Sequence, residues 1–179
     1  MTREGSLGIY NGFPERYHYA YLIEAYAPIK DVQRAIANAL HEVNGRSVRD
    51  YWSRRLGADI DVIFEFGVAE DLTFHYIDSD TLSLLLKVIC EKELHVLDFI
   101  SIIRYYVQSA RGNGRNGRRR PLRFDYYFLR FIFGVRHIEI RVFHERGPQR
   151  ISAREIVEFL VENVNMFLAK NASVNMRLN

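Results

Sequence analysis

The residues best suited to ligand binding lie between positions 111 and 143, where arginines and aromatic residues are interleaved. The segment 111–120, RGNGRNGRRR, carries five arginines on a glycine-rich stretch, and such a loop can follow a phosphate backbone. Residues 122–133 and 135–144 then alternate in character in the way that two strands do. Glycine at the first central position favours a two-residue turn at Gly134-Val135, so the two strands are predicted to form a hairpin.

Pairing outward from that turn divides the predicted hairpin into two faces. The apolar face is expected to meet the core and consists of Tyr127, Leu129, Phe131, Ile138, Ile140 and Val142. On the other face, Arg130 is expected opposite Glu139 and Phe128 opposite Arg141, each pair contributing roughly 0.2–1 kcal/mol. Aromatic rings on a sheet can stack on bases, so this face and the preceding loop form a candidate surface for single-stranded RNA or DNA. The candidate nucleic-acid-binding residues are Arg111, Arg115, Arg118, Arg119, Arg120, Phe124, Tyr126, Phe128, Arg130, Arg141 and Phe143.

A second interpretation of the same residues stays open. The aromatic face could be buried against a partner or against a second copy of the chain, with the glycine–arginine loop as a solvated connection. The strands also lack the glycine–aromatic order of an RNA-recognition motif, because Asp125 stands where that motif has a small or apolar residue. The sequence thus supports a nucleic-acid-binding accessory protein, with a homo-oligomeric or complex-forming interaction protein as the alternative.

A third hypothesis, an enzyme or a metal protein, rests on acidic residues and a histidine. Asp59, Asp61 and Glu65 share one face of the alternating run 59–66, opposite its apolar residues. The strand expected to pair with this run could bring His75 to the same face. Carboxylates beside a histidine could bind a hard or borderline metal, or serve in acid–base chemistry. The ordinary alternative is a solvated strand face.

The common catalytic motifs are absent from the sequence. It has no G-x-x-x-x-G-K-[ST] phosphate loop, no G-x-S-x-G elbow and no H-E-x-x-H zinc site. Predicted helices at 79–92 and 96–110 resemble a helix-turn-helix in spacing, but the second has only Arg104 as a cation and is expected in the core. The leading prediction therefore names no catalytic residue, cofactor or metal, and an enzyme remains the third alternative, because catalytic groups can be scattered along a sequence.

Composition is that of an ordinary soluble globular chain. A hydrophobic fraction of 48% over 179 residues suits one folded domain, and the net charge of +3 does not by itself imply a nucleic-acid partner. No apolar run approaches the ~18 residues of a membrane helix, and the N-terminus has no signal-peptide pattern, so no membrane partner is expected. The one cysteine, Cys90, is expected as a buried thiol in a reducing, cytoplasmic compartment. Arginine is abundant (21, against 4 Lys), and with few glutamines this fits a thermophile or a GC-rich genome.

The elements that would position these residues follow the order β-α-α-β-β-α-α-β-β-α. The expected helices span 28–44, 47–57, 79–92, 96–110 and 152–168, and the expected strands span 17–26, 59–66, 72–76, 122–133 and 135–144. Ser47 with Asp50 and Ser152 with Glu155 have the spacing of capping boxes, and Asp78 can cap the helix at 79–92. Because the strands come mainly as hairpins, the predicted fold class is α+β, with an antiparallel or mixed sheet and helices on one face. One domain is expected over 1–170, followed by a disordered tail at 171–179.

Overall fold

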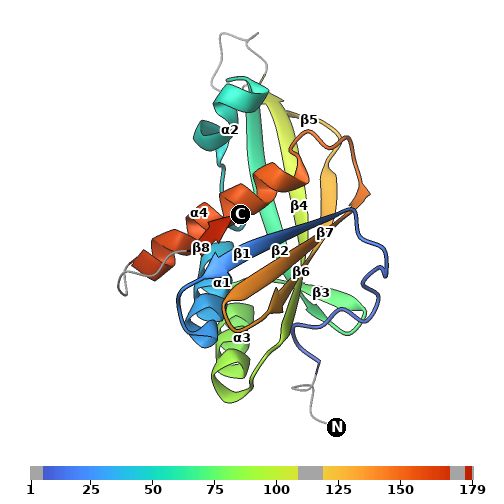
Figure 1. Cartoon of the computed structure of the whole chain (residues 1–179). Helices are drawn as coiled ribbons and strands as arrows, with labels where there is room; N and C mark the ends of the chain where they lie inside the picture. The colour runs from blue at the N-terminus through green and yellow to red at the C-terminus, as the bar shows by residue number, and fades with distance from the viewer. Residues whose placement is uncertain (1–5, 109–118, 170–175, 179) are drawn as a thin grey trace.

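Apolar residues recur every three to four residues in the helices and every second residue in most of the strands. The computed structural model describes residues 6–108, 119–169 and 176–178, which form one α+β arrangement, the class predicted from the sequence (Figure 1). The helices are α1 (Ile29–Val43), α2 (Arg49–Leu56), α3 (Ser79–Glu91) and α4 (Ala153–Ala169). The strands are β1 (Tyr19–Ala25), β2 (Ile60–Glu70), β3 (Thr73–Tyr76), β4 (Val96–Gln108), β5 (Arg119–Pro121), β6 (Asp125–Phe133), β7 (His137–Arg146) and β8 (Met176–Leu178).

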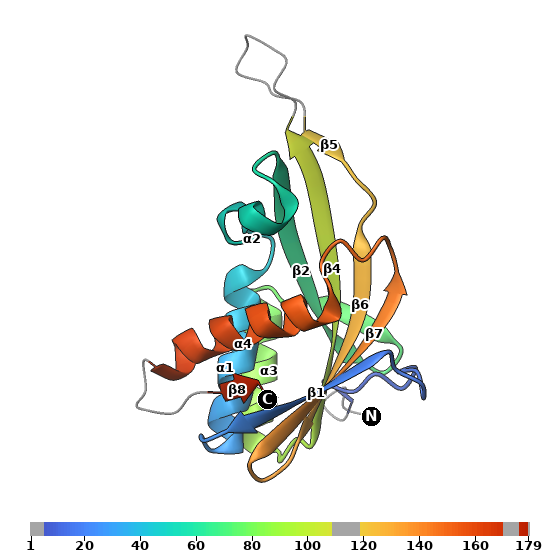
Figure 2. The ribbon, with the colours of Figure 1, turned by 45° about the horizontal axis from the view of Figure 1, so that its top comes forward.

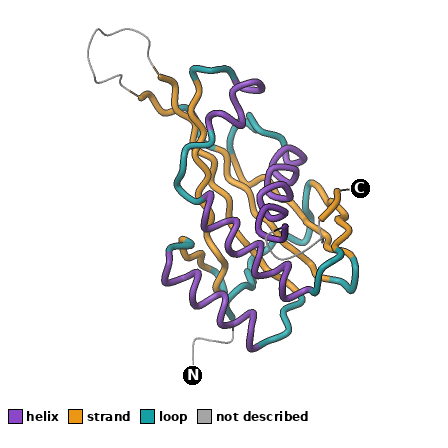
Figure 3. The backbone as a smooth tube through the Cα atoms, turned by 90° about the vertical axis from the view of Figure 1, so that its left-hand side faces the viewer, coloured by secondary structure: helices purple, strands orange, loops and turns teal. Residues whose placement is uncertain are grey.

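The strands form one sheet in the order β3-β2-β4-β6-β7-β1-β8, with β5 added beside β4. Every strand pair within the described residues is antiparallel, which decides between the antiparallel and mixed sheets that the sequence left open. Figure 2 shows α1, α3 and α4 together on one side of the sheet, and Figure 3 shows helices in front of the strands. We call the other side, which carries Tyr126 and Phe128 of β6 and the preceding Phe124, the helix-free face.

Local capping chemistry fixes where two of the helices begin. The Asp78 carboxylate accepts a hydrogen bond of 2.8 Å from the Thr81 backbone N–H and caps α3. At α4, the Ser152 hydroxyl accepts from the Glu155 N–H at 3.2 Å, while the Glu155 carboxylate accepts from the Ser152 N–H at 2.8 Å. This reciprocal pair is the capping box expected from the sequence.

The core lies between the sheet and the helices. Alternate residues of β6 face it, and Leu129 and Phe131 are at most 1% exposed. Burial of such a side chain contributes roughly 1.5–3 kcal/mol. From the helix layer, Phe159 of α4 stacks on Phe64 of β2, with ring centroids 4.9 Å apart. The apolar face predicted for the β6–β7 hairpin is thus confirmed as its core face.

The prediction of a helix over 96–110 is wrong. Residues 96–108 form β4, an interior strand that pairs with β2 on one side and β6 on the other. Odd-numbered residues such as Phe99 and Ile103 are buried in the core, whereas even-numbered residues such as Ile102 face the helix-free side. Because both faces of the strand are largely apolar, apolar residues also recur at spacings of three and four, which are typical of a helix. The many β-branched and aromatic residues were the better guide, and this segment contains no helix-turn-helix.

The β6–β7 turn is longer than predicted. Phe133 pairs with Ile138, and residues 134–136 join the two strands instead of two residues. The Gly134 N–H donates to the His137 carbonyl oxygen at 2.8 Å and closes it. The register is therefore shifted by two residues from the predicted one, and an even shift leaves each side chain on its predicted face.

The cross-strand neighbours on the helix-free face change with that register. Arg130 lies opposite Arg141, not Glu139, and Phe128 lies opposite Phe143, not Arg141. The predicted Arg130–Glu139 and Phe128–Arg141 pairs are therefore wrong. Each arginine instead finds its carboxylate elsewhere on the same face.

Two local predictions fail, one at Ser47 and one at Cys90. Ser47 does not cap α2; its hydroxyl donates to the Asp61 carboxylate of β2. Cys90, expected in the core, is exposed near the end of α3, where its carbonyl oxygen accepts from the Lys30 ammonium at 2.8 Å.

Part of the tail expected to be disordered belongs to the sheet. Residues 176–178 form β8 and pair with the last residues of β1, from Ile23 to Ala25. Residues 171–175 and 179 lie outside the described part of the chain.

Candidate nucleic-acid interface

Side chains on the helix-free face form rows across the sheet, since paired residues of neighbouring strands lie about 5 Å apart. One row runs through Ile100, Phe128 and Phe143 of β4, β6 and β7. The next row, two residues further along, runs through Glu65, Ile102, Tyr126 and Arg146. These rows mark the boundary between a part that the chain itself covers and a part that it leaves open.

The covered part lies beneath residues 6–18, which precede β1. The Tyr10 ring packs against Phe74 and Phe128, with ring centroids 4.8 and 5.2 Å away. The His18 ring stacks on Phe143 at 4.5 Å, with the two planes 13° apart. We call this part the covered half; its sheet residues are Phe74, Phe128, Arg130, Arg141 and Phe143.

Both arginines of the covered half also contact aromatic rings of the N-terminal segment. The Arg130 guanidinium lies 4.3 Å from the centre of the Phe13 ring, and that of Arg141 lies 4.7 Å from the centre of the Tyr17 ring. Arg141 also pairs with Glu139 at 2.6 Å. Cation–π contacts of this kind contribute about 0.5–2 kcal/mol. The segment thus occupies the ring and guanidinium faces that a base would use.

A buried ion pair fastens this segment to the sheet. Asp98 is 1% exposed, and its two carboxylate oxygens accept hydrogen bonds of 2.8 Å from Nε and Nη2 of Arg130. The same carboxylate accepts from the Tyr10 backbone N–H at 2.8 Å, and Arg130 donates to the Tyr10 carbonyl oxygen at 3.2 Å. Bidentate charge-assisted bonds of this geometry are strong, so the covered half is a fixed part of the fold.

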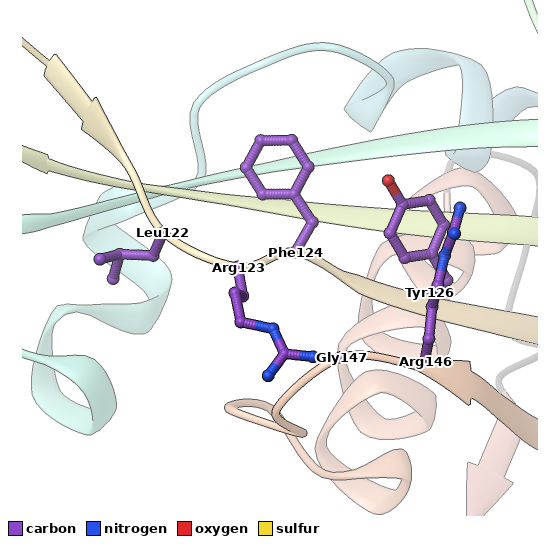
Figure 4. Close-up of a pocket in the computed structure, with 6 residues that line it drawn as sticks. All are labelled: Leu122, Arg123, Phe124, Tyr126, Arg146 and Gly147. Carbon is purple, nitrogen blue, oxygen red and sulfur yellow. The ribbon is translucent and has the colours of Figure 1, made fainter.

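Beyond the covered half the face bears a cavity of about 290 Å³ (Figure 4). Its lining residues are Leu122, Arg123, Phe124, Tyr126, Arg146 and Gly147. In the close-up, the Arg146 side chain lies beside the Tyr126 ring, with its guanidinium 4.2 Å from the ring centre. The Arg123 side chain extends toward Gly147. The lining of the cavity thus combines two aromatic rings with two arginines, one of which lies against the Tyr126 ring. We call this part the open half; its central residues are Glu65, Ile102, Arg104, Phe124, Tyr126 and Arg146.

The arginines near this cavity differ in whether a carboxylate neutralises them. Arg119 pairs with Asp61, which is 1% exposed, and Nη2 of Arg104 lies 3.0 Å from the Glu65 carboxylate. In the described part of the chain, the arginines without an acidic partner here are Arg120, Arg123 and Arg146. The rim of the cavity is therefore positively charged.

A buried carboxylate supports the cavity from the core side. Asp125 is fully buried and accepts hydrogen bonds from the Tyr105 hydroxyl at 2.6 Å and from the backbone N–H groups of Gln149 and Arg150 at 2.7 and 3.0 Å. The imidazole Nε2 of His144 lies 3.3 Å from the same carboxylate. Burial, with Asp125 beside it, raises the pKa of the Tyr105 phenol, which keeps the hydroxyl protonated as a donor. Asp125 therefore holds β4, β6 and the segment leading to α4 together.

Gly147 allows the chain to turn tightly at the edge of the cavity. Its φ of +117° lies in a region that favours glycine, and a Cβ atom there would overlap the Asp125 carboxylate and the Phe124 carbonyl oxygen. The close approach of this backbone to β6 places Arg146 beside Tyr126.

The predicted nucleic-acid-binding residues fall into three groups. Those at or next to the open cavity are Phe124, Tyr126, Arg119 and Arg120. Those in contact with the N-terminal segment, or stacked beneath it, are Phe128, Arg130, Arg141 and Phe143. Arg111, Arg115 and Arg118 lie outside the described residues.

Sequence reasoning missed two cavity residues, Arg123 and Arg146. Arg123 directly precedes Phe124, but strand alternation assigned it to the opposite face. Arg146 lies beyond the predicted end of its strand, and an irregularity of register between Tyr126 and Tyr127 brings it opposite Tyr126. Local sequence carries no clear indication of such a bulge.

The predicted acidic and histidine site is not assembled. His75 pairs in register with Val68, and its Nε2 lies 2.5 Å from Glu70, outside the acidic run that contains Asp61 and Glu65. Among residues 6–108, 119–169 and 176–178, no group of three His, Cys, Asp or Glu side chains could hold a metal ion.

The functional inference rests on the fold and on the open half of the helix-free face. No helix in the part that the structure describes is both long and apolar enough to span a bilayer. Comparison of the chain with protein-family models, with curated proteins and with solved structures finds no match. Fold and surface together define an α+β protein with an arginine–aromatic surface at one end of its helix-free face.

Proposed function

We propose that this chain binds single-stranded nucleic acid through the open half of its helix-free face. The observation that carries the proposal is the cavity lined by Phe124, Tyr126, Arg123 and Arg146, in which the Arg146 guanidinium lies 4.2 Å from the centre of the Tyr126 ring. Stacking of a base on an aromatic ring contributes about 1–3 kcal/mol, and guanidinium groups form paired hydrogen bonds to phosphate oxygens. Bases and phosphates thus both find complementary groups at one place.

The geometry of the rings favours a single strand over a duplex. Phe124 directly precedes β6 and Tyr126 is its second residue, so extended backbone would space the two by roughly 7 Å. The faces of bases become available to such rings only where the bases are unpaired and unstacked. A single strand laid along β6 can therefore present consecutive bases to the two rings.

The unneutralised charge supplies the contacts to phosphates. Arg123 and Arg146 line the same cavity as the rings, and Arg120, the last residue of the arginine-rich segment 111–120, lies on β5 shortly before Phe124. Each phosphate neutralised on a single strand contributes about 0.7 to the slope of log K against log salt, so binding should weaken markedly as salt rises. Toward Phe128 the site ends where residues 6–18 cover the helix-free face.

The experiment is a fluorescence-anisotropy titration of labelled single-stranded RNA and DNA with wild type, Phe124→Ala and Tyr126→Ala. Each alanine variant should lose about tenfold in affinity, the equivalent of one base stack. Tyr19→Ala is the matched control, because it removes a 42% exposed tyrosine from β1, on the helix side of the sheet, and should bind like wild type.

Two outcomes would contradict the proposal. The first is that wild type binds neither nucleic acid at any salt concentration, and the second is that both cavity variants bind as tightly as wild type. In the first case, sedimentation of the wild-type protein would show whether the open half is instead a contact between two copies of the chain.

A further inference from the structure

A second cavity on the helix-free face lies between β3, β2 and β4, next to the first. Its volume is about 240 Å³, and its lining includes Glu65, Gly67, Phe74, Tyr76, Ile100 and Ile102. This is smaller than the ~300–1,000 Å³ of sites that enclose drug-sized ligands, so its occupant is a single small group. Gly67 gives the cavity its depth, because a Cβ atom there would lie only 3.1 Å from the Ile100 side chain.

One row of the sheet connects the two cavities. Glu65 pairs with Ile102, and Ile102 pairs with Tyr126. Two strand spacings separate Glu65 from Tyr126, roughly 10 Å between their backbones. Arg104 contacts both sides, with its guanidinium 5.5 Å from the Phe124 ring centre and 3.0 Å from the Glu65 carboxylate. A nucleic-acid strand that stacks one base on Tyr126 and then turns across the sheet along this row places a neighbouring base at the second cavity.

The chemistry of the second cavity selects among bases. Its floor is apolar, and the charged group in its lining is the Glu65 carboxylate, which accepts hydrogen bonds and donates none; the Tyr76 hydroxyl is a second polar group in the lining. Arg104 contacts only Oε2 of Glu65, and because a carboxylate has about four acceptor positions, Glu65 can still accept a hydrogen bond from a base. The 4-amino group of cytosine donates to such a carboxylate, whereas the 4-keto oxygen of uracil or thymine is repelled by it. Tyr76, 49% exposed, adds a ring at the rim on which a base can stack.

We propose that this cavity is a base-selective subsite that takes a cytosine in preference to uracil or thymine. The proposal rests on the nucleic-acid binding proposed above, because the strand reaches the cavity through its contacts at Tyr126 and Arg146. Glu65 is the specificity-determining residue, and Ile100, Ile102 and Gly67 shape the space for one ring.

The test compares short labelled oligocytidine and oligouridine in the anisotropy titration. Wild type should bind oligocytidine roughly tenfold more tightly. Glu65→Gln, whose amide both donates and accepts, should bind the two oligonucleotides nearly equally. Glu139→Gln is the matched control, since Glu139 is also an arginine-paired carboxylate but belongs to the covered side, and it should keep the preference.

A second measurement needs no variant. An oligonucleotide of pyrimidin-2-one bases lacks the 4-amino group, and wild type should bind it about as weakly as oligouridine. Equal binding of oligocytidine and oligouridine by wild type, or an undiminished preference in Glu65→Gln, would overturn the subsite and leave the proposed function standing. Failure of wild type to bind either oligonucleotide would overturn both.

Discussion

Replacement of Asp125 by alanine removes the acceptor that joins three parts of the chain. The Tyr105 hydroxyl of β4 donates to this carboxylate at 2.6 Å, and the backbone N–H groups of Gln149 and Arg150 donate at 2.7 and 3.0 Å. All of these bonds converge on a side chain with no exposed surface. The variant therefore leaves three donors without their partner at the base of the arginine–aromatic cavity.

The cost can be worked out from those three donors. An unsatisfied buried donor costs about 1–3 kcal/mol, and small shifts or an entering water will recover part of the sum. A loss of about 3–5 kcal/mol in the free energy of unfolding follows, similar to the removal of one partner from a buried ion pair. That is a large share of the ~5–15 kcal/mol by which domains are stable. Asp125→Asn, which keeps one acceptor oxygen, should lose less.

The assay is urea unfolding followed by the fluorescence of Trp52, the one tryptophan, which is 4% exposed and reports on the core. Asp59→Ala removes an exposed carboxylate and should change stability by no more than ~0.5 kcal/mol. If Asp125→Ala costs less than ~1 kcal/mol, the idea that this carboxylate organises the region is refuted.

Three further predictions concern other parts of the fold. Asp98→Ala should lower the free energy of unfolding by about 2–4 kcal/mol, because Arg130 and the Tyr10 N–H lose their acceptor. Limited proteolysis of residues 6–18 should also become faster. An unchanged cleavage rate would contradict the role of Asp98 in fastening this segment to the sheet. Gly147→Ala should lower Tm by an amount equivalent to about 1–3 kcal/mol, because alanine is strained at φ +117° and its Cβ overlaps Asp125. Burial, with a hydrogen bond to Glu162, raises the pKa of Tyr51 to about 12 from 10.0, so the protonated phenol is favoured by folding. The protonated Tyr51 phenol contributes fully to the free energy of unfolding below pH 10, and this contribution is lost as the pH rises toward 12. Urea titrations should therefore show a smaller decline in stability between pH 10 and 12 for Tyr51→Phe than for wild type.

The parts of the fold that the sequence predicted are those encoded over short distances. The starts of α3 and α4 follow from Asp78 and from the Ser152–Glu155 pair, whose bonds span three residues. The two faces of the β6–β7 hairpin follow from the period of two, which tolerates an even error in register. The core face was therefore predicted correctly although the turn was not.

The parts that the sequence could not provide depend on distant contacts. Arg130 and Tyr10 are 120 residues apart, so nothing near Phe128 indicates that residues 6–18 cover half of the aromatic face. β4 lies in the interior of the sheet, and apolar residues on both of its faces hide the period of two. Arg146 reaches Tyr126 only through a local irregularity of register. The candidate surface could thus be located from sequence, but its division into open and covered halves could not.

The most direct test of nucleic-acid binding at the open half is the salt dependence of single-stranded RNA affinity. Wild type is compared with the double variant Arg123→Ala/Arg146→Ala and with Arg136→Ala, which removes an exposed arginine from the turn at the other end of β6. Loss of two phosphate contacts should reduce the slope of log K against log salt by about 1.4, whereas Arg136→Ala should leave it unchanged. An unaltered slope in the double variant, or an equal reduction in Arg136→Ala, would contradict binding at this site.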